Sequence, residues 1–231
     1  MSDCTGTLYG VSVGPGDPEL ITVKSKKVLE RCPVLALPET HKGNSLALTI
    51  AGKVIDLSHK ELLPLRFPML ADQEQLRLNY EAHAARLEQV LSGGQDVAFI
   101  CLGDVSVFST FAYIGKILIR GGYSVVMLPG VTSFCASACA LGVSLTAANQ
   151  PLHIIPAGYG DVDGALELPG AKVLMKSASQ FPAVRRAVLA SGQPACAAVD
   201  CGLDSQRLYH DLADMPEESG YFTTIIVKET L

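Results

Sequence analysis

The sequence predicts an α/β protein made of two α/β domains. Short apolar runs alternate with stretches of helical periodicity through the first half of the chain, as in a parallel sheet covered by helices. The second half changes to several short strand-like runs with one long helical stretch, which indicates a mixed α/β domain. We therefore expect an amino-terminal domain over residues 1–121 and a carboxy-terminal domain over 122–231.

The first domain is expected to open with a strand, a stiff loop and a helix. An apolar run leads into Gly14-Pro15-Gly16-Asp17-Pro18. The two glycines allow close backbone approaches, and the two prolines fix φ. Asp17 is expected to cap a helix over 20–31, with Pro18 at its first position. A loop of this kind at the end of a first strand lies where open α/β sheets bind ligands.

The other elements of this domain follow the same alternation. The expected strands cover 33–37 and 96–102, and the expected helices cover 45–51, 72–91 and 107–119. Asp72 is suited to cap the longest helix, with Gln75 completing a capping box. The continuous apolar run over 96–102 suits the middle of a parallel sheet.

The second domain is expected to begin with a strand over 124–128 and a helix of small residues over 131–141. Pro129-Gly130 turns the chain between them. Further strands are expected over 152–156, 171–175, 195–200, 207–210 and 222–227, and a further helix over 179–191.

The glycine-rich opening loop does not match two known phosphate-binding patterns. A dinucleotide fingerprint read from Gly14 needs a third glycine where the chain has Glu19. A P-loop needs Ser or Thr after Gly-Lys, and neither Gly52-Lys53 nor Gly115-Lys116 has one. Two other interpretations stay open: an ordinary tight turn that caps a helix, and an NAD enzyme in which Glu39 binds the ribose.

Composition and charge exclude several classes of protein. With 231 residues, 48% hydrophobic and 18% charged, the chain is a compact globular protein. Its net charge of −5 disfavours nucleic-acid binding. The uncharged stretch between Arg120 and Asp161 is interrupted by Pro129-Gly130 and Pro151, so we expect no membrane span. The amino terminus lacks the features of a signal peptide, so we expect a cytoplasmic protein.

The cysteines are odd in number and scattered, which predicts reduced and buried thiols. They are Cys4, Cys32, Cys101, Cys135, Cys139, Cys196 and Cys201. A metal site is the alternative, because Cys135 and Cys139 are four residues apart on an expected helix and Cys196 and Cys201 flank an expected strand. The chain has no C-x-x-C pair, so we expect no metal.

Three strand-end loops carry a resemblance to a known family. They are Gly14-Pro15-Gly16-Asp17, Leu102-Gly103-Asp104 and Pro129-Gly130-Val131-Thr132-Ser133. In this order and spacing they resemble the tetrapyrrole (precorrin) methyltransferases, over essentially the whole chain. The resemblance implies two α/β domains with S-adenosylmethionine in the cleft between them, S-adenosylhomocysteine as a product, and a homodimer.

Further segments resemble the branch of that family that methylates C-20 of precorrin-2 or cobalt-factor II in cobalamin (vitamin B12) biosynthesis. They are Leu65-Arg66-Phe67-Pro68-Met69, Phe108-Ser109-Thr110-Phe111 and Tyr221-Phe222-Thr223-Thr224-Ile225-Ile226-Val227. Two positions depart from the family pattern, since Ser12 stands where glycine is common and Val105 where proline is usual. Another precorrin or uroporphyrinogen methyltransferase, and a carrier that has lost the chemistry, are the alternatives.

The resemblance implies cofactor contacts from both domains, through backbone groups, hydroxyls and apolar side chains. The expected cofactor-binding residues are Pro15, Leu102, Gly103, Asp104, Val107, Thr132, Ser133, Met175, Cys201, Gly202, Thr223 and Thr224. Asp104 has two interpretations: it can accept from the ammonium or ribose of the cofactor, or cap the helix expected from residue 107. Asp17 is expected only to cap a helix.

The implied reaction is attack by an electron-rich meso carbon of a reduced tetrapyrrole on the methyl group, in line with the departing sulfur. Alignment is then the main contribution of the protein, and the sequence identifies no catalytic side chain. The ring carries many carboxylates, so we expect local cations to bind it. The candidates are Lys24, Lys42, Arg66 and Lys176, and for each a solvated surface charge is the alternative.

Overall fold

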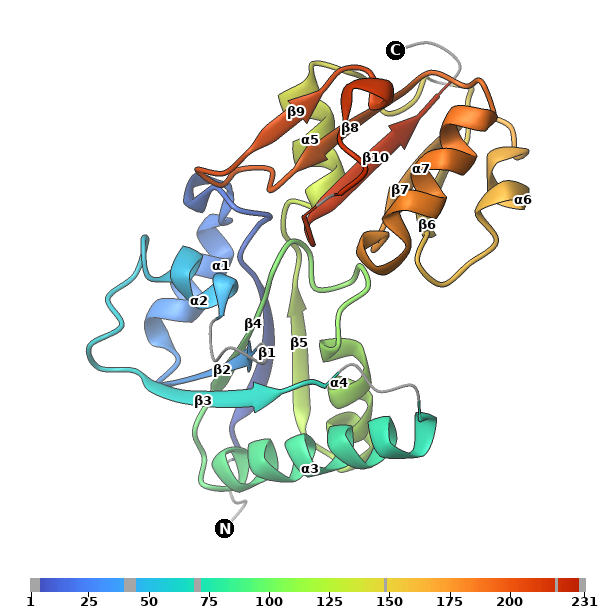
Figure 1. Cartoon of the computed structure of the whole chain (residues 1–231). Coiled ribbons are helices and arrows are strands. Elements are labelled where there is room, and N and C mark those ends of the chain that lie inside the picture. The colour runs from blue at the N-terminus through green and yellow to red at the C-terminus, as the bar shows by residue number, and fades with distance from the viewer. Residues whose placement is uncertain (1–4, 40–44, 69–71, 148, 219, 229–231) are drawn as a thin grey trace. The chain divides into compact units, whose positions relative to one another are not determined.

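Figure 1 shows the computed structural model of the chain, which describes residues 5–39, 45–68, 72–147, 149–218 and 220–228. The chain divides into two compact units, the first ending at Thr132 and the second beginning at Ser133. Each unit is a sheet with helices on both faces, which confirms the predicted pair of α/β domains.

The first unit contains a parallel sheet with the strand order β3-β2-β4-β1-β5. Its strands are β1 (Thr7–Ser12), β2 (Val34–Glu39), β3 (Glu61–Arg66), β4 (Val97–Cys101) and β5 (Ser124–Leu128). The expected boundary after residue 121 lies before β5, whereas β5 pairs with β1 and so belongs to this sheet. The division after Thr132 therefore follows the last strand of the first sheet.

Two layers of helices cover the two faces of this sheet (Figure 1). The helices are α1 (Val23–Arg31), α2 (Leu46–Ala51), α3 (Gln73–Ser92) and α4 (Phe111–Arg120). Side chains of β4 alternate between the layers: Val97 and Phe99 pack with α3 and α4, whereas Ala98 and Ile100 pack with α1 and α2. All four side chains are fully buried, as expected for a central parallel strand.

Two helix starts differ from the sequence prediction. Asp17 does accept a hydrogen bond from the backbone N–H of Glu19, but it caps a short 3-10 turn over Pro18–Leu20. Helix α1 begins after this turn, with Thr22 as its cap. Helix α4 begins at Phe111 rather than near residue 107, because Phe108 has a positive φ of 48° that interrupts helical geometry.

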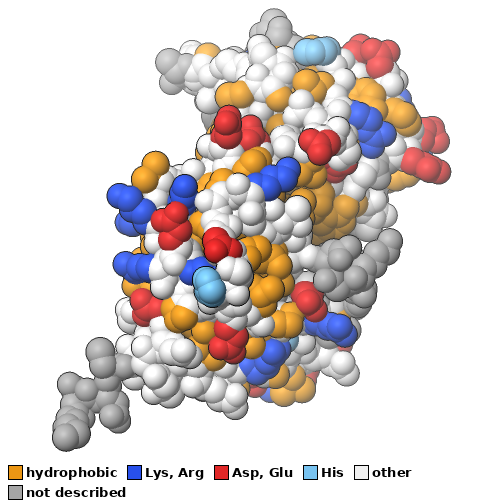
Figure 2. Space-filling model, turned by 90° about the vertical axis from the view of Figure 1, so that its left-hand side faces the viewer, with side chains coloured by type: hydrophobic (Ala, Val, Ile, Leu, Met, Phe, Trp, Pro, Cys, Tyr) orange, Lys and Arg blue, Asp and Glu red, His pale blue; other side chains and the backbone are white. Residues whose placement is uncertain are grey.

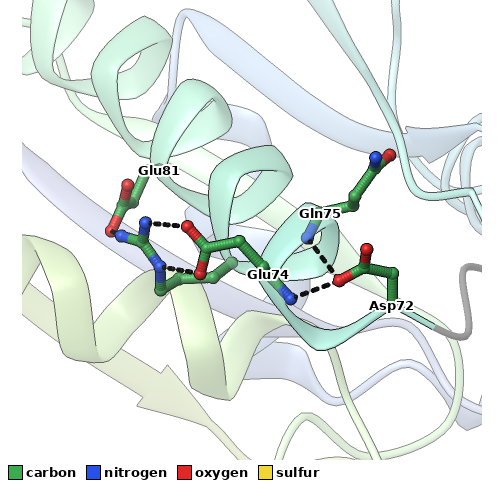
Figure 3. A network of polar contacts seen from close by, with 5 residues as sticks. Asp72, Glu74, Gln75 and Glu81 are labelled. Atoms are coloured by element: carbon green, nitrogen blue, oxygen red, sulfur yellow. Dashed lines mark hydrogen bonds and ion pairs between the residues drawn. The ribbon is translucent and has the colours of Figure 1, made fainter.

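Asp72 caps α3 as predicted (Figure 3). Its carboxylate accepts from the backbone N–H groups of Glu74 at 2.8 Å and Gln75 at 3.3 Å. The side-chain amide of Gln75 points away from Asp72, so Gln75 takes part through its backbone. Arg77 lies between Glu74 and Glu81 and pairs with both on the exposed face of the helix.

Strand β3 was not expected from the sequence, because Pro64 interrupts its short apolar run. A proline is tolerated there since β3 is an edge strand that pairs with β2 alone.

The second unit contains a mixed sheet with the order β6-β7-β10-β8-β9, in which β6 and β7 are parallel and the other pairs are antiparallel. Its strands are β6 (Leu152–Pro156), β7 (Ala171–Met175), β8 (Ala195–Val199), β9 (Arg207–Tyr209) and β10 (Thr223–Val227). Helix α5 (Ser133–Leu141) packs on one face, and α6 (Val162–Leu166) and α7 (Phe181–Ala190) pack on the other. The five-residue helix α6 was not expected.

The described helices include none that is both long enough and apolar enough to cross a membrane.

Candidate functional site

The loops after β1 and β4 are joined through their glycines. The backbone N–H of Gly103 donates to the carbonyl of Gly14 at 2.7 Å, and the N–H of Gly14 donates back at 3.3 Å. Gly14 has a φ of +74° and Gly103 a φ of +72°, which side-chain-bearing residues rarely adopt. Two of the three predicted loops therefore form one backbone platform at the carboxyl edge of the first sheet.

The third loop reaches the same place through Gly130. A Cβ atom on Gly130 would lie 2.3 Å from the Cβ of Ser12 and 2.9 Å from the carbonyl oxygen of Gly103. Only glycine fits between these two groups without displacing them. The three loops that the sequence singled out thus converge, and they do so by backbone packing.

Asp104 connects two of these loops. Its Oδ2 atom accepts from the N–H of Gly130 at 2.6 Å, and its Oδ1 atom accepts from the N–H of Ser106 at 2.8 Å and from the Ser106 hydroxyl. Burial of Asp104, which is 7% exposed, opposes ionisation, but these hydrogen bonds outweigh it and hold the pKa below its ordinary value. The expected cap of a helix from residue 107 is therefore wrong: Asp104 caps a turn and ties it to Gly130.

Ser12 is a further residue at this edge, to which the sequence assigned no role in the site. Its side chain is fully buried, and its hydroxyl donates to the carbonyl of Leu128 at 2.7 Å. The same oxygen accepts from the N–H of Val105 at 2.9 Å. The two departures from the family pattern are thus partners in one hydrogen bond. The departure of Ser12 from the family pattern was the sequence signal that pointed to it.

The expected cofactor residues of the first unit lie in these three loops. Pro15, in the loop after β1, is buried. Leu102, Gly103, Asp104 and Val107 belong to the loop after β4, where Leu102 and Val107 are half-buried. Thr132 ends the unit and is also half-buried.

The expected cofactor residues of the second unit gather at one edge of its sheet, apart from Ser133, which begins α5. Met175 ends β7, and Thr223 and Thr224 begin β10, the antiparallel neighbour of β7. On the other side of β10, Val199 pairs with Thr223, so the turn that holds Cys201 and Gly202 follows at the same edge. Antiparallel pairing therefore brings together segments that are far apart in sequence.

Two strained residues flank the start of β10. Lys176, directly after β7, has a φ of 53°, and Asp200, directly after β8, has a φ of 52°. The N–H of Asp200 donates to the carbonyl of Phe222 at 2.9 Å, which holds this conformation in place. Strained backbone of this kind concentrates at functional sites. Lys176 is exposed, yet desolvation of its ammonium lowers its pKa from the ordinary value.

The four candidate cations differ in their surroundings. Lys24 is exposed on α1, and Arg66 is exposed at the end of β3, where its Nε lies 3.4 Å from Oε2 of Glu39. Lys42 falls outside the described residues, as does Met69 of the segment that carries Arg66. On the face drawn in Figure 2, basic side chains are interspersed with acidic ones.

The dinucleotide interpretation conflicts with the strand order of the first unit. The sheet places β4 between β1 and β2, whereas the nucleotide-binding order has the first two strands adjacent. The carboxylate of Glu39, which would bind a ribose in that interpretation, makes a contact of 3.4 Å with Arg66.

Most of the described cysteines are buried thiols. Burial raises the pKa of Cys32 to about 11 and that of Cys196 to about 11. Cys101 and Cys201 are also buried, whereas Cys135 and Cys139 are exposed on α5, so burial was the wrong expectation for these two. Cys4 falls outside the described residues. In the part of the chain that the structure describes, no three His, Cys, Asp or Glu side chains group as metal ligands would.

Comparison with known proteins gives consistent results. A family model described as Tetrapyrrole (Corrin/Porphyrin) Methylases matches residues 7–216. The chain is 36% identical to a probable cobalt-precorrin-2 C(20)-methyltransferase of Methanocaldococcus jannaschii, over 77% of this chain and 75% of that protein. It is 32% identical to the cobalt-precorrin-2 C(20)-methyltransferase of Salmonella typhimurium, over 97% of both.

A solved structure shares the fold. It is a uroporphyrin-III C-methyl transferase from Thermus thermophilus, complexed with S-adenyl homocysteine. The TM-score is 0.70 at 23% identity, and the match covers 97% of this chain and 98% of that one.

Proposed function

The chain belongs to the tetrapyrrole (corrin/porphyrin) methylases, the family that its three strand-end loops led us to expect, and we propose that it methylates C-20 of precorrin-2 or of its cobalt-containing counterpart. The methyl donor is S-adenosylmethionine, and the reaction serves corrin-ring synthesis on the route to cobalamin. One observation carries the proposal: a relative named for this reaction matches the chain over nearly its whole length.

The residues of the first unit fit such a donor. Its ribose and methionine ends need hydrogen-bonding partners at short range, and the Gly14–Gly103 platform presents backbone with no Cβ in the way. Asp104 has about four lone-pair sites, of which the Ser106 and Gly130 donors occupy three. Its carboxylate can therefore hold Gly130 and still accept from a ribose hydroxyl or an ammonium.

The residues of the second unit fit as well. Thr223 and Thr224 are buried at the start of β10, and Met175 offers an apolar, polarizable side chain at the end of β7. Tyr221 and Phe222, exposed next to them, form an edge-to-face pair with ring centroids 5.0 Å apart. Exposed aromatic rings give a planar tetrapyrrole an apolar surface on which to pack.

Bound S-adenosylmethionine supplies an electrophilic methyl group on a sulfonium. The chain's own contribution is to align the attacking ring carbon with that methyl group and to exclude water. Alignment of this kind contributes roughly 7 to 11 kcal/mol in well-oriented systems. Loops fixed by backbone bonds, such as the Gly14–Gly103 pair, suit that task because little conformational freedom remains to be lost.

The carboxylates of the ring require cations, and Arg66 is the strongest candidate because its guanidinium can bind a carboxylate through two bonds. It is 78% exposed and makes a single contact of 3.4 Å with Glu39, so it can reorient toward a ligand at low cost. Lys24 and Lys176 are the other described candidates. The relatives described above are both named for the cobalt-containing ring, which favours that form. A homodimer in the cytoplasm is also proposed, on the family resemblance.

The test is a methyl-transfer assay with isotopically labelled S-adenosylmethionine and the two rings, metal-free and cobalt-containing, side by side. We expect one methyl group to appear on C-20, with a change in the absorption spectrum of the ring. Transfer to a different carbon would replace this proposal with another reaction of the family. Binding of the donor without turnover would favour a carrier, and tight binding of NAD alone would overturn the proposal.

A further inference from the structure

We propose that Ser12 is a positioning residue that sets the conformation of the turn at Asp104, acting through the backbone N–H of Val105. The inference rests on the proposed function, because this turn adjoins Leu102 and Gly103, which we expect to touch S-adenosylmethionine. Ser12 itself is fully buried, so any effect it has on a ligand passes through the residues it contacts.

The hydroxyl of Ser12 joins three segments at the carboxyl edge of the first sheet. Ser12 is the last residue of β1. Its hydroxyl donates its single proton to the carbonyl of Leu128 at the end of β5 and accepts from the N–H of Val105 in the loop after β4. A hydroxyl has one donor and two acceptor sites, so donation to Leu128 leaves a lone pair for Val105. The orientation of the hydroxyl is thereby fixed from both sides.

The turn itself spans Asp104 to Val107, closed by a bond of 3.2 Å from the N–H of Val107 to the carbonyl of Asp104. Within it, the Asp104 side chain accepts from Ser106, a common arrangement at the first position of a turn. Val105 holds the second position, so its N–H points out of the turn and toward Ser12. The carboxylate thus closes the turn from one side while Ser12 holds it from the other.

These contacts form a closed circuit of hydrogen bonds and chain segments. The Ser12 hydroxyl donates to Leu128, the chain leads from Leu128 to Gly130, and the N–H of Gly130 donates to Asp104. Val105 follows Asp104 in the chain, and its N–H donates to the Ser12 hydroxyl. Every hydrogen bond in the circuit joins a side chain to a backbone group. Loss of the Ser12 hydroxyl opens it and leaves a buried N–H and a buried carbonyl without that partner.

The second position of a turn is also the position that proline favours, since a proline ring fixes φ where this turn needs it. A proline at 105 has no N–H, and its ring carbon would point at the Ser12 oxygen, which lies only 2.9 Å from the nitrogen of residue 105. Ser12 and a proline at 105 therefore exclude one another. In this chain the hydrogen bond from Val105 to Ser12 restrains the turn, as the ring of a proline at 105 would do covalently.

The test compares Ser12→Ala, Val105→Pro and the double variant Ser12→Ala/Val105→Pro, with Ser92→Ala as the control. Ser92→Ala also removes a serine hydroxyl, one that makes a 2.7 Å contact with the hydroxyl of Tyr123, but Ser92 lies before β4 at the amino edge of the same sheet. Calorimetric titration with S-adenosylhomocysteine gives the affinity, and urea unfolding gives the stability of each protein.

We expect Ser12→Ala to weaken binding about tenfold while the protein stays folded, and Ser92→Ala to leave binding unchanged. Val105→Pro is expected to weaken binding and lower stability more than Ser12→Ala does. The double variant is expected to bind more tightly and to be more stable than Val105→Pro, because the proline ring gains the space of the lost hydroxyl. Wild-type affinity in folded Ser12→Ala, or additive effects in the double variant, would overturn the inference.

Failure of the proposed function gives a different result. If the wild-type protein binds neither S-adenosylmethionine nor S-adenosylhomocysteine, the proposed function is wrong, and with it the role of Ser12 in cofactor binding. The coupling between residues 12 and 105 is then still decided by the unfolding measurements, in which purely additive effects would show that the two residues do not act together.

Discussion

Gly14 and Gly103 exchange two backbone hydrogen bonds, of 2.7 and 3.3 Å, although they follow different strands and are far apart in sequence. Both have positive φ angles, so the pairing needs glycine at both positions. The consequence is that the two loops behave as one piece, and a side chain at either glycine would strain the backbone. A third glycine, Gly130, packs against the same piece.

Gly130→Ala should weaken S-adenosylhomocysteine binding severely and destabilise the protein by about 1 to 3 kcal/mol, as overpacking does. The new Cβ would lie 2.3 Å from the Cβ of Ser12, and neither atom can rotate away. Urea unfolding and calorimetric titration measure the two effects. Gly115→Ala is the control, because a Cβ there would meet its nearest neighbours at an ordinary 3.5 Å. A Gly130→Ala protein as stable as wild type would contradict the packing described above.

Asp104→Asn should remove a pH-dependent part of the stability. The hydrogen bonds to Asp104 hold its pKa below the ordinary value of 3.8 in the folded protein. Ionisation therefore stabilises the fold at pH values above the unfolded pKa, and this contribution is lost as the pH falls through the lowered folded pKa. We expect Asp104→Asn to cost about 1 to 3 kcal/mol at neutral pH, since an amide nitrogen cannot accept from the N–H of Gly130.

The check is the free energy of unfolding of both proteins between neutral pH and about pH 3. The gap between wild type and Asp104→Asn should be constant near neutrality and shrink at the acid end. Asp161→Asn is a suitable control, because Asp161 caps the short helix α6 through one bond of 3.0 Å to Gly164. If the difference in the free energy of unfolding instead widens in acid, the charge on Asp104 does not stabilise the turn.

The sequence was sufficient to predict the alternation of elements and the three converging loops, because both depend on local signals. Glycine and proline mark the loops, and apolar periodicity marks strands and helices. It was insufficient where a long-range partner decides the outcome. Strand β3 contains Pro64 and forms only because β2 offers an edge to pair with.

The site shows the same limit at the level of single residues. Ser12 and Val105 are separated by 93 positions, and the sequence presents them as two unrelated departures from a family pattern. Only the fold brings them within 2.9 Å. The backbone strain at Lys176 and Asp200 is likewise invisible in sequence, because the antiparallel pairing of β10 with β7 and β8 imposes the geometry of that edge.

Arg66→Ala should raise the KM for the tetrapyrrole about tenfold and leave the affinity for S-adenosylhomocysteine unchanged. The guanidinium is 78% exposed and available to a carboxylate of the ring, so its loss removes binding without disturbing the core. Arg77→Ala is the matched control, because Arg77 is also an exposed, carboxylate-paired arginine, on α3 (Figure 3). Steady-state kinetics with the tetrapyrrole as the varied substrate give the KM of Arg66→Ala and of Arg77→Ala. An unchanged KM for Arg66→Ala would remove Arg66 from the substrate site.

Lys176→Asn should stabilise the protein and impair its activity at the same time. Lys176 has a φ of 53°, a conformation that asparagine adopts more readily than lysine, so the substitution relieves strain of about 1 kcal/mol. It also removes the ammonium, which we expect to bind a carboxylate of the ring. Lys176→Arg keeps both the strain and the charge and should resemble wild type in both measurements. Urea unfolding combined with the KM for the tetrapyrrole makes the comparison. A stabilised Lys176→Asn protein with an unchanged KM would show that the strain is structural and that the ammonium does not contact the substrate.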